Sequence, residues 1–88
     1  MRAEMVTVPN PSGLHARPAS EFVALARTFQ SRVAVRNVSA GGRAADAKNP
    51  LRLLGAKIYQ HDQIEISAEG PDEDEAVEAL VAFVRSLG

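Results

Sequence analysis

One histidine, at the junction between a loop and a helix, is the chain's strongest candidate for chemistry. His15 lies within residues 11–19, Pro-Ser-Gly-Leu-His-Ala-Arg-Pro-Ala. The first backbone N–H groups of a helix are unpaired, and together with the helix dipole they attract anions. The same positive end favours an uncharged imidazole, whose free nitrogen is a nucleophile that can accept a phosphoryl group. The stretch therefore predicts a phosphate-handling site.

Two neighbours of His15 could help it to hold a phosphate. Arg17 lies two residues further on, and its planar guanidinium suits a phosphate oxygen. Gly13 lets the backbone come close without a Cβ. The spacing also fits a plainer interpretation, in which His15 only precedes a helix and Arg17 is a solvated surface charge. From the residues alone, both interpretations remain open.

The other candidate residues fit structural explanations better. His61 lies beside Asp62 in a polar stretch, which is typical of a surface turn. The acidic run at residues 72–75 coincides with the expected start of a helix, where negative charge complements the dipole, so no metal site is predicted. The spacing shows no glycine-rich nucleotide loop and no Ser/His/Asp arrangement. Tyr59 and Phe83 are expected to be packing residues.

The remaining sequence supplies the elements that must position His15. Alternating apolar residues predict strands, and apolar residues three or four apart predict helices. The expected strands cover residues 4–8, 32–38, 43–47 and 63–69, and the expected helices cover residues 16–30, 50–55 and 72–87. Because the strands are amphipathic, helices should cover one face of the sheet and leave the other to water. The order β-α-β-β-α-β-α predicts a two-layer α+β sandwich.

Local signals mark the turns and the core. Ser-Ala-Gly-Gly at residues 39–42 predicts a hairpin turn. Asn49 is expected to cap the short helix, with Pro50 at its first position. The residues expected to face the core are Val33, Val35 and Asn37 in the second strand, Ile64, Ile66 and Ala68 in the last strand, and residues 76, 77, 80, 83, 84 and 87 in the last helix.

Composition narrows the class of protein. The 88 residues are enough for one domain, and the absence of cysteine excludes disulfides and thiolate metal sites. No apolar run is long enough to span a bilayer and no signal peptide is evident, so a soluble cytoplasmic protein is expected. Residues 1–61 hold nine of the ten Lys and Arg residues, which suits an anionic ligand or acidic partners. With 5% aromatic residues, nucleic-acid binding is not expected.

The sequence resembles one known family over nearly its whole length. Residues 13–19, Gly-Leu-His-Ala-Arg-Pro-Ala, resemble the active-site motif of HPr, the histidine-containing phosphocarrier family of the bacterial phosphoenolpyruvate-dependent sugar phosphotransferase system. Residues 64–70, Ile-Glu-Ile-Ser-Ala-Glu-Gly, resemble the last strand of that family. The resemblance implies one HPr domain over residues 1–88, with a four-stranded antiparallel sheet covered on one face by three helices.

The resemblance also implies roles for particular residues. His15 would accept a phosphoryl group on Nδ1 from enzyme I and pass it to the EIIA domain of a sugar permease. Arg17 would stabilise the phosphorylated ring, and the phosphate would be bound by Ser12, Ala16 and Arg17. The residues that would dock both partners are Pro50, Leu51 and Leu54. Such a protein is a carrier and not a turnover enzyme, and it is expected to be a monomer without cofactor, metal or membrane insertion.

Two departures from the family pattern stand out. Many HPr proteins carry a regulatory serine directly after the lysine that precedes the short helix, and here Lys48 is followed by Asn49. Since asparagine cannot be phosphorylated, HPr kinase is not expected to modify this chain. Residues 37–47 also look longer than in common members, which predicts a longer hairpin turn.

Two alternatives remain open at this stage. Within the family, the chain could be a nitrogen-branch (NPr-like) phosphocarrier that relays phosphate to regulatory proteins. Outside it, the chain could be a non-catalytic anion-sensing or protein-binding module in which His15 is structural.

Overall fold

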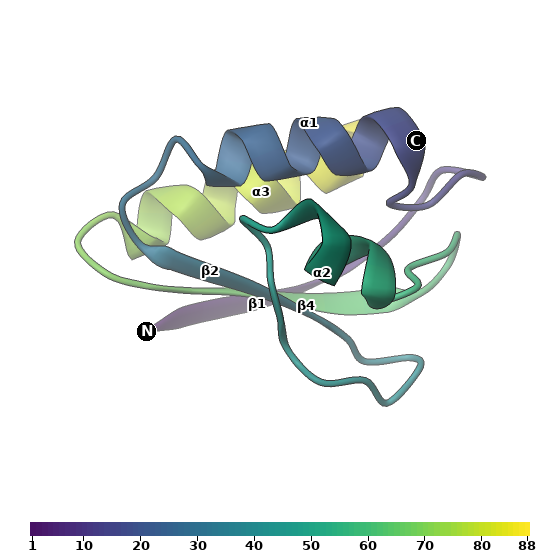
Figure 1. The fold of residues 1–88 in the computed structure, drawn as a ribbon, viewed down its shortest axis with the longest axis horizontal. Coiled ribbons are helices and arrows are strands. Elements are labelled where there is room, and N and C mark those ends of the chain that lie inside the picture. Colours follow the sequence, from purple (N-terminus) through teal and green to yellow (C-terminus); the bar gives the residue numbers. More distant parts are fainter.

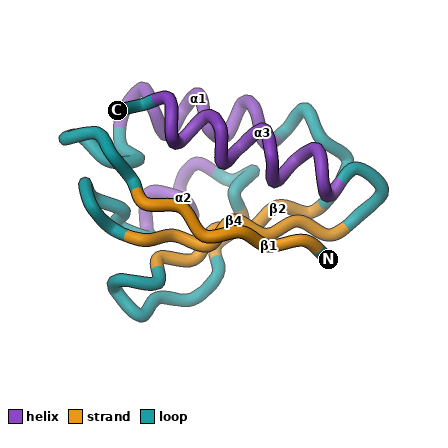
Figure 2. The backbone as a smooth tube through the Cα atoms, turned by 180° about the vertical axis from the view of Figure 1, so that it is seen from behind, coloured by secondary structure: helices purple, strands orange, loops and turns teal.

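The elements follow the predicted β-α-β-β-α-β-α order. A computed structural model describes all residues from 1 to 88, and its three helices lie on one side of the sheet (Figures 1 and 2). The elements are β1 (Arg2–Thr7), α1 (Ala16–Ala26), β2 (Arg32–Asn37), β3 (Ala45–Asp46), α2 (Pro50–Gly55), β4 (Gln63–Glu69) and α3 (Glu73–Ser86). None of the helices is long and apolar enough to cross a membrane.

The four strands form an antiparallel sheet in the order β1-β4-β2-β3. The predicted alternation is confirmed in the two central strands, because Val35 lies opposite Ile66 and both are fully buried. Asn37 is also buried, as expected, and its Nδ2 donates to Asp62 Oδ2 at 3.0 Å. The sheet therefore buries one face under the helices.

Helix α3 supplies much of the core against which the sheet packs. Its predicted apolar positions 76, 77, 80 and 84 are fully buried, and Phe83 packs on Phe22 of α1 with ring centroids 6.1 Å apart. Val81, which was not predicted to face inward, is buried as well. The reason is that α3 packs on both the sheet and α1, so its buried face is wider than that of a helix with one neighbour.

Helix α1 and strand β3 are each shorter than predicted by three or more residues, whereas β2 and α3 lose only one residue at an end. Helix α1 ends at Ala26 rather than residue 30, because the backbone groups that follow find other partners: Phe29 O accepts from Lys48 Nζ at 2.7 Å. Strand β3 is reduced from residues 43–47 to Ala45–Asp46, which pair with Val35 and Ala34. Alanine is a poor strand former, so little holds the rest of that segment in the ladder.

The start of α2 matches its predicted capping. Asn49 Oδ1 accepts from the backbone N–H groups of Leu51 and Arg52 at 3.0 and 3.3 Å, and Pro50 is the first helical residue. An asparagine side chain in this position replaces the partners that the first N–H groups of a helix lack. The cap thus fixes where α2 begins beside α1.

Candidate functional site

His15 is the residue at which the loop after β1 becomes α1. Its backbone is extended, with φ −126° and ψ 164°, and its side chain makes no capping hydrogen bond. The next residue, Ala16, has φ 50°. A non-glycine residue in the left-handed region costs about 1–3 kcal/mol and persists only where its surroundings enforce it. The chain therefore holds a strained turn directly after the histidine.

The loop before His15 is held against the loop between α2 and β4. Leu14 N–H donates to Ile58 O at 3.2 Å. At Gly13, which has φ 61°, an added Cβ would lie 2.3 Å from that same oxygen, closer than any real contact. Glycine is therefore required at this position both for its φ and for the approach of the second loop.

Asn10 organises the rest of the loop and was missed by the sequence reasoning. It is buried, and its Nδ2 donates to Ser12 Oγ at 2.9 Å and to Gly13 O at 3.0 Å. Its position between two prolines, Pro9 and Pro11, is the one signal that could have identified it, since an asparagine there commonly bonds its own turn. Asn10 thus fixes where the Ser12 hydroxyl lies.

The two ring nitrogens of His15 have different environments. Nε2 is buried and has no hydrogen-bond partner, whereas Nδ1 is neither buried nor hydrogen-bonded within the chain. The Tyr59 ring packs on the imidazole, with centroids 5.0 Å apart and the planes tilted by 37°. Tyr59 is 56% exposed, so the prediction that it is an ordinary packing residue is wrong. The accessible nucleophilic nitrogen is Nδ1.

Arg17 points away from the loop. Its side chain is 88% exposed, and its Nε lies 3.8 Å from Glu21 Oε1 one turn along α1. An exposed pair of this kind contributes only about 0–1 kcal/mol. The guanidinium makes no contact that would prevent it from turning toward an anion at the start of the helix.

A groove between α1 and α2 begins beside the histidine. It has a volume of about 290 Å³ and is lined by Ala16 and further residues of α1 together with Pro50 and Leu54 of α2. Of the three leucines of α2, Leu53 is fully buried, whereas Leu51 is 80% and Leu54 is 41% exposed. The three predicted docking residues therefore all lie at the surface, and two of them share this groove with Ala16.

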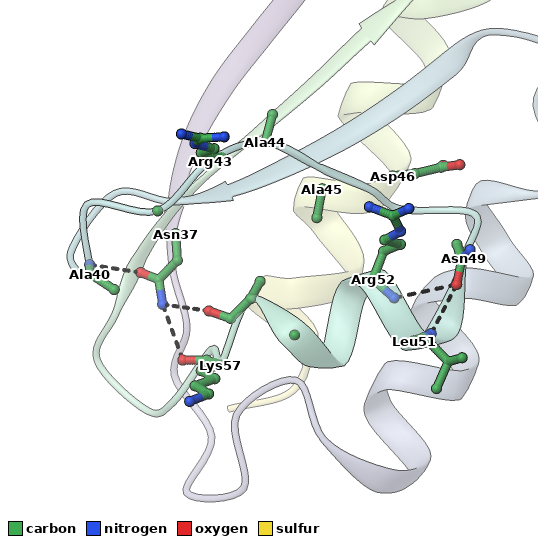
Figure 3. A pocket seen from close by; sticks show the side chains of 13 residues that line it. Asn37, Ala40, Arg43, Ala44, Ala45, Asp46, Asn49, Leu51, Arg52 and Lys57 are labelled. Atoms are coloured by element: carbon green, nitrogen blue, oxygen red, sulfur yellow. Dashed lines mark hydrogen bonds between the residues drawn. The ribbon is translucent and has the colours of Figure 1, made fainter.

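A larger hollow lies on the other side of α2 (Figure 3). It occupies about 780 Å³ between α2 and the segment that precedes β3, and Leu51 lies on its rim. Its lining carries the cations Arg43, Arg52 and Lys57. His15 does not line it, so the hollow is separate from the histidine, and Asp46 is the one acidic residue in its lining.

His61 is an exposed turn residue, as predicted, with φ 73° and with its backbone N–H donating to Val8 O at 2.7 Å. No group of three or more His, Cys, Asp or Glu side chains is arranged to hold a metal ion.

Comparison with known proteins identifies the same stretch. A family model described as PTS HPr component phosphorylation site matches residues 3–86. The phosphocarrier protein HPr of Lysinibacillus sphaericus is 40% identical, over 100% of this chain and 97% of that protein. A solved HPr from Thermoanaerobacter tengcongensis has a TM-score of 0.93 at 34% identity, over 99% of this chain and 94% of that one. An HPr dimer from the same organism has a TM-score of 0.76 at 35% identity, over 100% and 99% of the two chains.

These matches span nearly the whole chain and include the stretch around His15, and the fold is the open-faced α+β sandwich that the resemblance implied. The chain therefore belongs to the HPr family of the phosphotransferase system, whose members are phosphocarrier proteins and not turnover enzymes.

Proposed function

We propose that Nδ1 of His15 is the atom that carries the phosphoryl group, taking it from phosphorylated enzyme I and giving it to an EIIA domain. The observation that carries this proposal is the asymmetry of the ring, with Nε2 buried and Nδ1 open. In the first transfer the Nδ1 lone pair forms a bond to phosphorus while the bond between phosphorus and the donor breaks. In the second transfer Nδ1 is the leaving group.

The start of α1 supplies donors for the phosphate. The backbone N–H groups of Ala16 and Arg17 precede the first intrahelical bonds, and Pro18 has no N–H. Ser12 Oγ already accepts from Asn10 Nδ2, so its own proton is free to be donated to a phosphate oxygen. Arg17 leaves Glu21 and adds a charged donor. These three residues form the proposed phosphate site.

Partner docking is assigned to Pro50, Leu51 and Leu54. The groove that Pro50 and Leu54 share with Ala16 brings an apolar contact next to the transferred group. The cations Arg43, Arg52 and Lys57 line the hollow on whose rim Leu51 lies, and they favour partners with acidic surfaces. Enzyme I and EIIA are the partners that family membership implies.

Residues 1–88 form one HPr domain in this proposal, and a single cluster of 20 buried apolar residues supports it. We also propose that the protein acts as a monomer, because every proposed contact of the phosphate comes from one chain. A cytoplasmic location is part of the same proposal, since the phosphoenolpyruvate that charges enzyme I is an intermediate of cytoplasmic metabolism.

Labelling with enzyme I, Mg²⁺ and radioactive phosphoenolpyruvate tests this function. We expect an acid-labile, base-stable phosphate on the protein that is absent from His15→Ala and that moves to an EIIA domain of a sugar permease. No label, or a label that persists in His15→Ala, would instead favour a non-catalytic binding module. Label that is transferred only to a regulatory EIIA protein would indicate the nitrogen branch.

A further inference from the structure

Tyr59 is an exposed aromatic residue on a loop whose backbone is held by several hydrogen bonds. It lies in the loop between α2 and β4, between two residues in the left-handed region, Lys57 with φ 52° and His61 with φ 73°. Each such non-glycine residue costs about 1–3 kcal/mol, so the surrounding contacts must enforce this loop conformation.

Those contacts join the Tyr59 loop to the His15 loop. Val8 O accepts from His61 N–H at 2.7 Å, and Pro9 O accepts from Gln60 Nε2 at 3.0 Å. The bond from Leu14 N–H to Ile58 O closes the same pair of loops at the residue before His15. The backbone of Tyr59 is therefore fixed relative to the backbone of His15.

Asp62 fixes the loop from the sheet side. One of its oxygens, Oδ2, accepts from Tyr59 N–H and from Asn37 Nδ2, both at 3.0 Å. Asn37 is buried in β2, so Tyr59 is tied to the centre of the sheet through a single carboxylate. The backbone of Tyr59 is therefore held in place by these bonds, although its side chain is 56% exposed.

The contact of that side chain is the imidazole of His15, 5.0 Å away between ring centroids. We propose that Tyr59 is a positioning residue for phosphoryl transfer: its ring holds the imidazole in the one orientation that buries Nε2 and presents Nδ1. The inference rests on the proposed phosphorylation of His15 and adds the reason why one nitrogen is used. The aromatic ring carries the role, and the hydroxyl does not.

Phosphoramidate, a small-molecule phosphoryl donor, tests the orientation without any partner protein. An imidazole nitrogen attacks its phosphorus, the P–N bond breaks, and the amine leaves as ammonia after taking a proton. Phosphorus-31 NMR distinguishes the two phosphohistidine isomers. We expect only the Nδ1 isomer in the wild-type protein and in Tyr59→Phe, and a second resonance from the Nε2 isomer in Tyr59→Ala. An unchanged single isomer in Tyr59→Ala overturns the proposal.

Transfer from enzyme I gives an independent measurement. Loss of an aromatic contact is expected to slow phosphorylation of Tyr59→Ala by roughly three- to tenfold, mainly in kcat, with Tyr59→Phe close to wild type. Because the side chain is largely exposed and the loop is held by backbone bonds, the alanine variant should keep the fold, which its amide NMR spectrum will show. Equal kcat values for a folded Tyr59→Ala and the wild type also overturn the proposal.

The chain contains one tyrosine and no tryptophan, so its near-ultraviolet emission reports on Tyr59 alone. We expect that emission to change when His15 is phosphorylated, and not to change when His15→Ala is treated in the same way. Failure of enzyme I to label His15 contradicts the proposed function. Normal labelling with an unchanged emission and a single isomer in Tyr59→Ala contradicts only the role of Tyr59.

Discussion

Helices α1 and α3 begin in opposite electrostatic states. Neither helix has a side-chain cap, but the first turn of α3 holds Glu73, Asp74 and Glu75, whereas the first turn of α1 holds no acidic residue. Both helices start with the same unpaired N–H groups and the same positive dipole end. In α3 the chain's own carboxylates complement that end, and in α1 no acidic side chain does so, which leaves it open to the proposed phosphate.

The residues at the start of α3 are also tied by hydrogen bonds to the segment that precedes β2. Asp72 accepts from the backbone N–H groups of Gln30 and Ser31, each at 2.9 Å, and from the Ser31 hydroxyl. Glu73 accepts from Gly70 N–H at 3.2 Å and pairs with the N-terminal amine at 3.0 Å. At the start of α1, by contrast, His15 Nε2 and Asn10 Oδ1 are buried without partners. The start of α3 is therefore held by bonds within the chain, whereas the start of α1 keeps unpartnered polar atoms where we propose that a phosphate binds.

The largest expected effect is at the glycine that precedes α1. Gly13→Ala should lower the free energy of unfolding by more than about 3 kcal/mol, because the new Cβ meets Ile58 O and the residue has φ 61°. Gly41→Ala is the matched control, since Gly41 has φ 66° but no atom within 4 Å of an added Cβ. Denaturant unfolding measures both. Similar losses in the two variants would mean that the approach of the second loop is unimportant.

In the proposed phosphate site Arg17 is the charged donor, although in the structure its side chain lies beside Glu21. Arg17→Ala should slow phosphoryl transfer to His15 by roughly ten- to a hundredfold, because a hydrogen bond to a charged group contributes about 1.5–3 kcal/mol. Rapid-quench assays with phosphorylated enzyme I measure the rate of phosphoryl transfer to His15. Glu21→Ala, which removes only the resting partner of Arg17, should not slow the reaction. A slow Glu21→Ala variant would show that the ion pair positions the arginine.

An acidic residue placed at the start of α1 should make it resemble α3. Ala16→Asp is expected to slow phosphorylation of His15 at least about fivefold, because two negative charges about 4 Å apart repel by about 1 kcal/mol even in water. Aspartate tolerates the left-handed φ of this position. Ala16→Asn, with the same shape and no charge, separates repulsion from size. Equal phosphorylation rates for Ala16→Asp and Ala16→Asn would show that charge repulsion is not the cause of the slowing.

At the start of α3 the expected change depends on pH. Bonds from the Ser31 hydroxyl and the Gln30 N–H hold the pKa of Asp72 below its ordinary value of 3.8. A lowered pKa in the folded state contributes stability that is present above pH 3.8 and is lost as the pH falls through the folded value. Denaturant midpoints measured from above pH 3.8 downward should therefore decrease more steeply with falling pH in the wild type than in Asp72→Asn. Parallel curves would contradict the role of Asp72.

The start of α2 gives the smallest expected effect on stability. Asn49→Ser keeps a capping oxygen, so the free energy of unfolding should change by only a few tenths of a kcal/mol. HPr kinase with ATP should leave the wild type unlabelled and label Asn49→Ser. A stoichiometric label on the wild type would contradict the prediction that HPr kinase does not modify this chain. An unlabelled Asn49→Ser would mean that residues other than Asn49 prevent phosphorylation by the kinase.

The sequence predicts local features of the fold and the site well. Strand β4 has its predicted bounds of Gln63–Glu69, because its alternation and the Gly-Pro that follows are both local signals. The cap at Asn49 and the loop-to-helix junction at His15 are equally local. Strand β3 is mispredicted because its length depends on pairing with β2 and not on its own residues.

Contacts between the two loops at the site could not be predicted. Tyr59 is far from His15 in sequence, and its polar surroundings gave no indication of a partner. Asn10 was missed for the same reason, since its burial depends on the loops packing together. The predicted position of Arg17 near the ring stays a prediction, because it requires the phosphate to be present. The predicted greater length of residues 37–47 also stays a prediction.

The groove between α1 and α2 has a consequence for how fast the protein can work. In the proposed docking, both partners use the groove lined by Ala16, the residue after His15, so a donor and an acceptor cannot occupy it together. On this proposal the carrier must dissociate from one partner before it binds the next, so the rate of the relay depends on the lifetime of each complex as well as on phosphoryl transfer. An interface of this kind is useful only if dissociation is fast, and tighter docking would slow the relay.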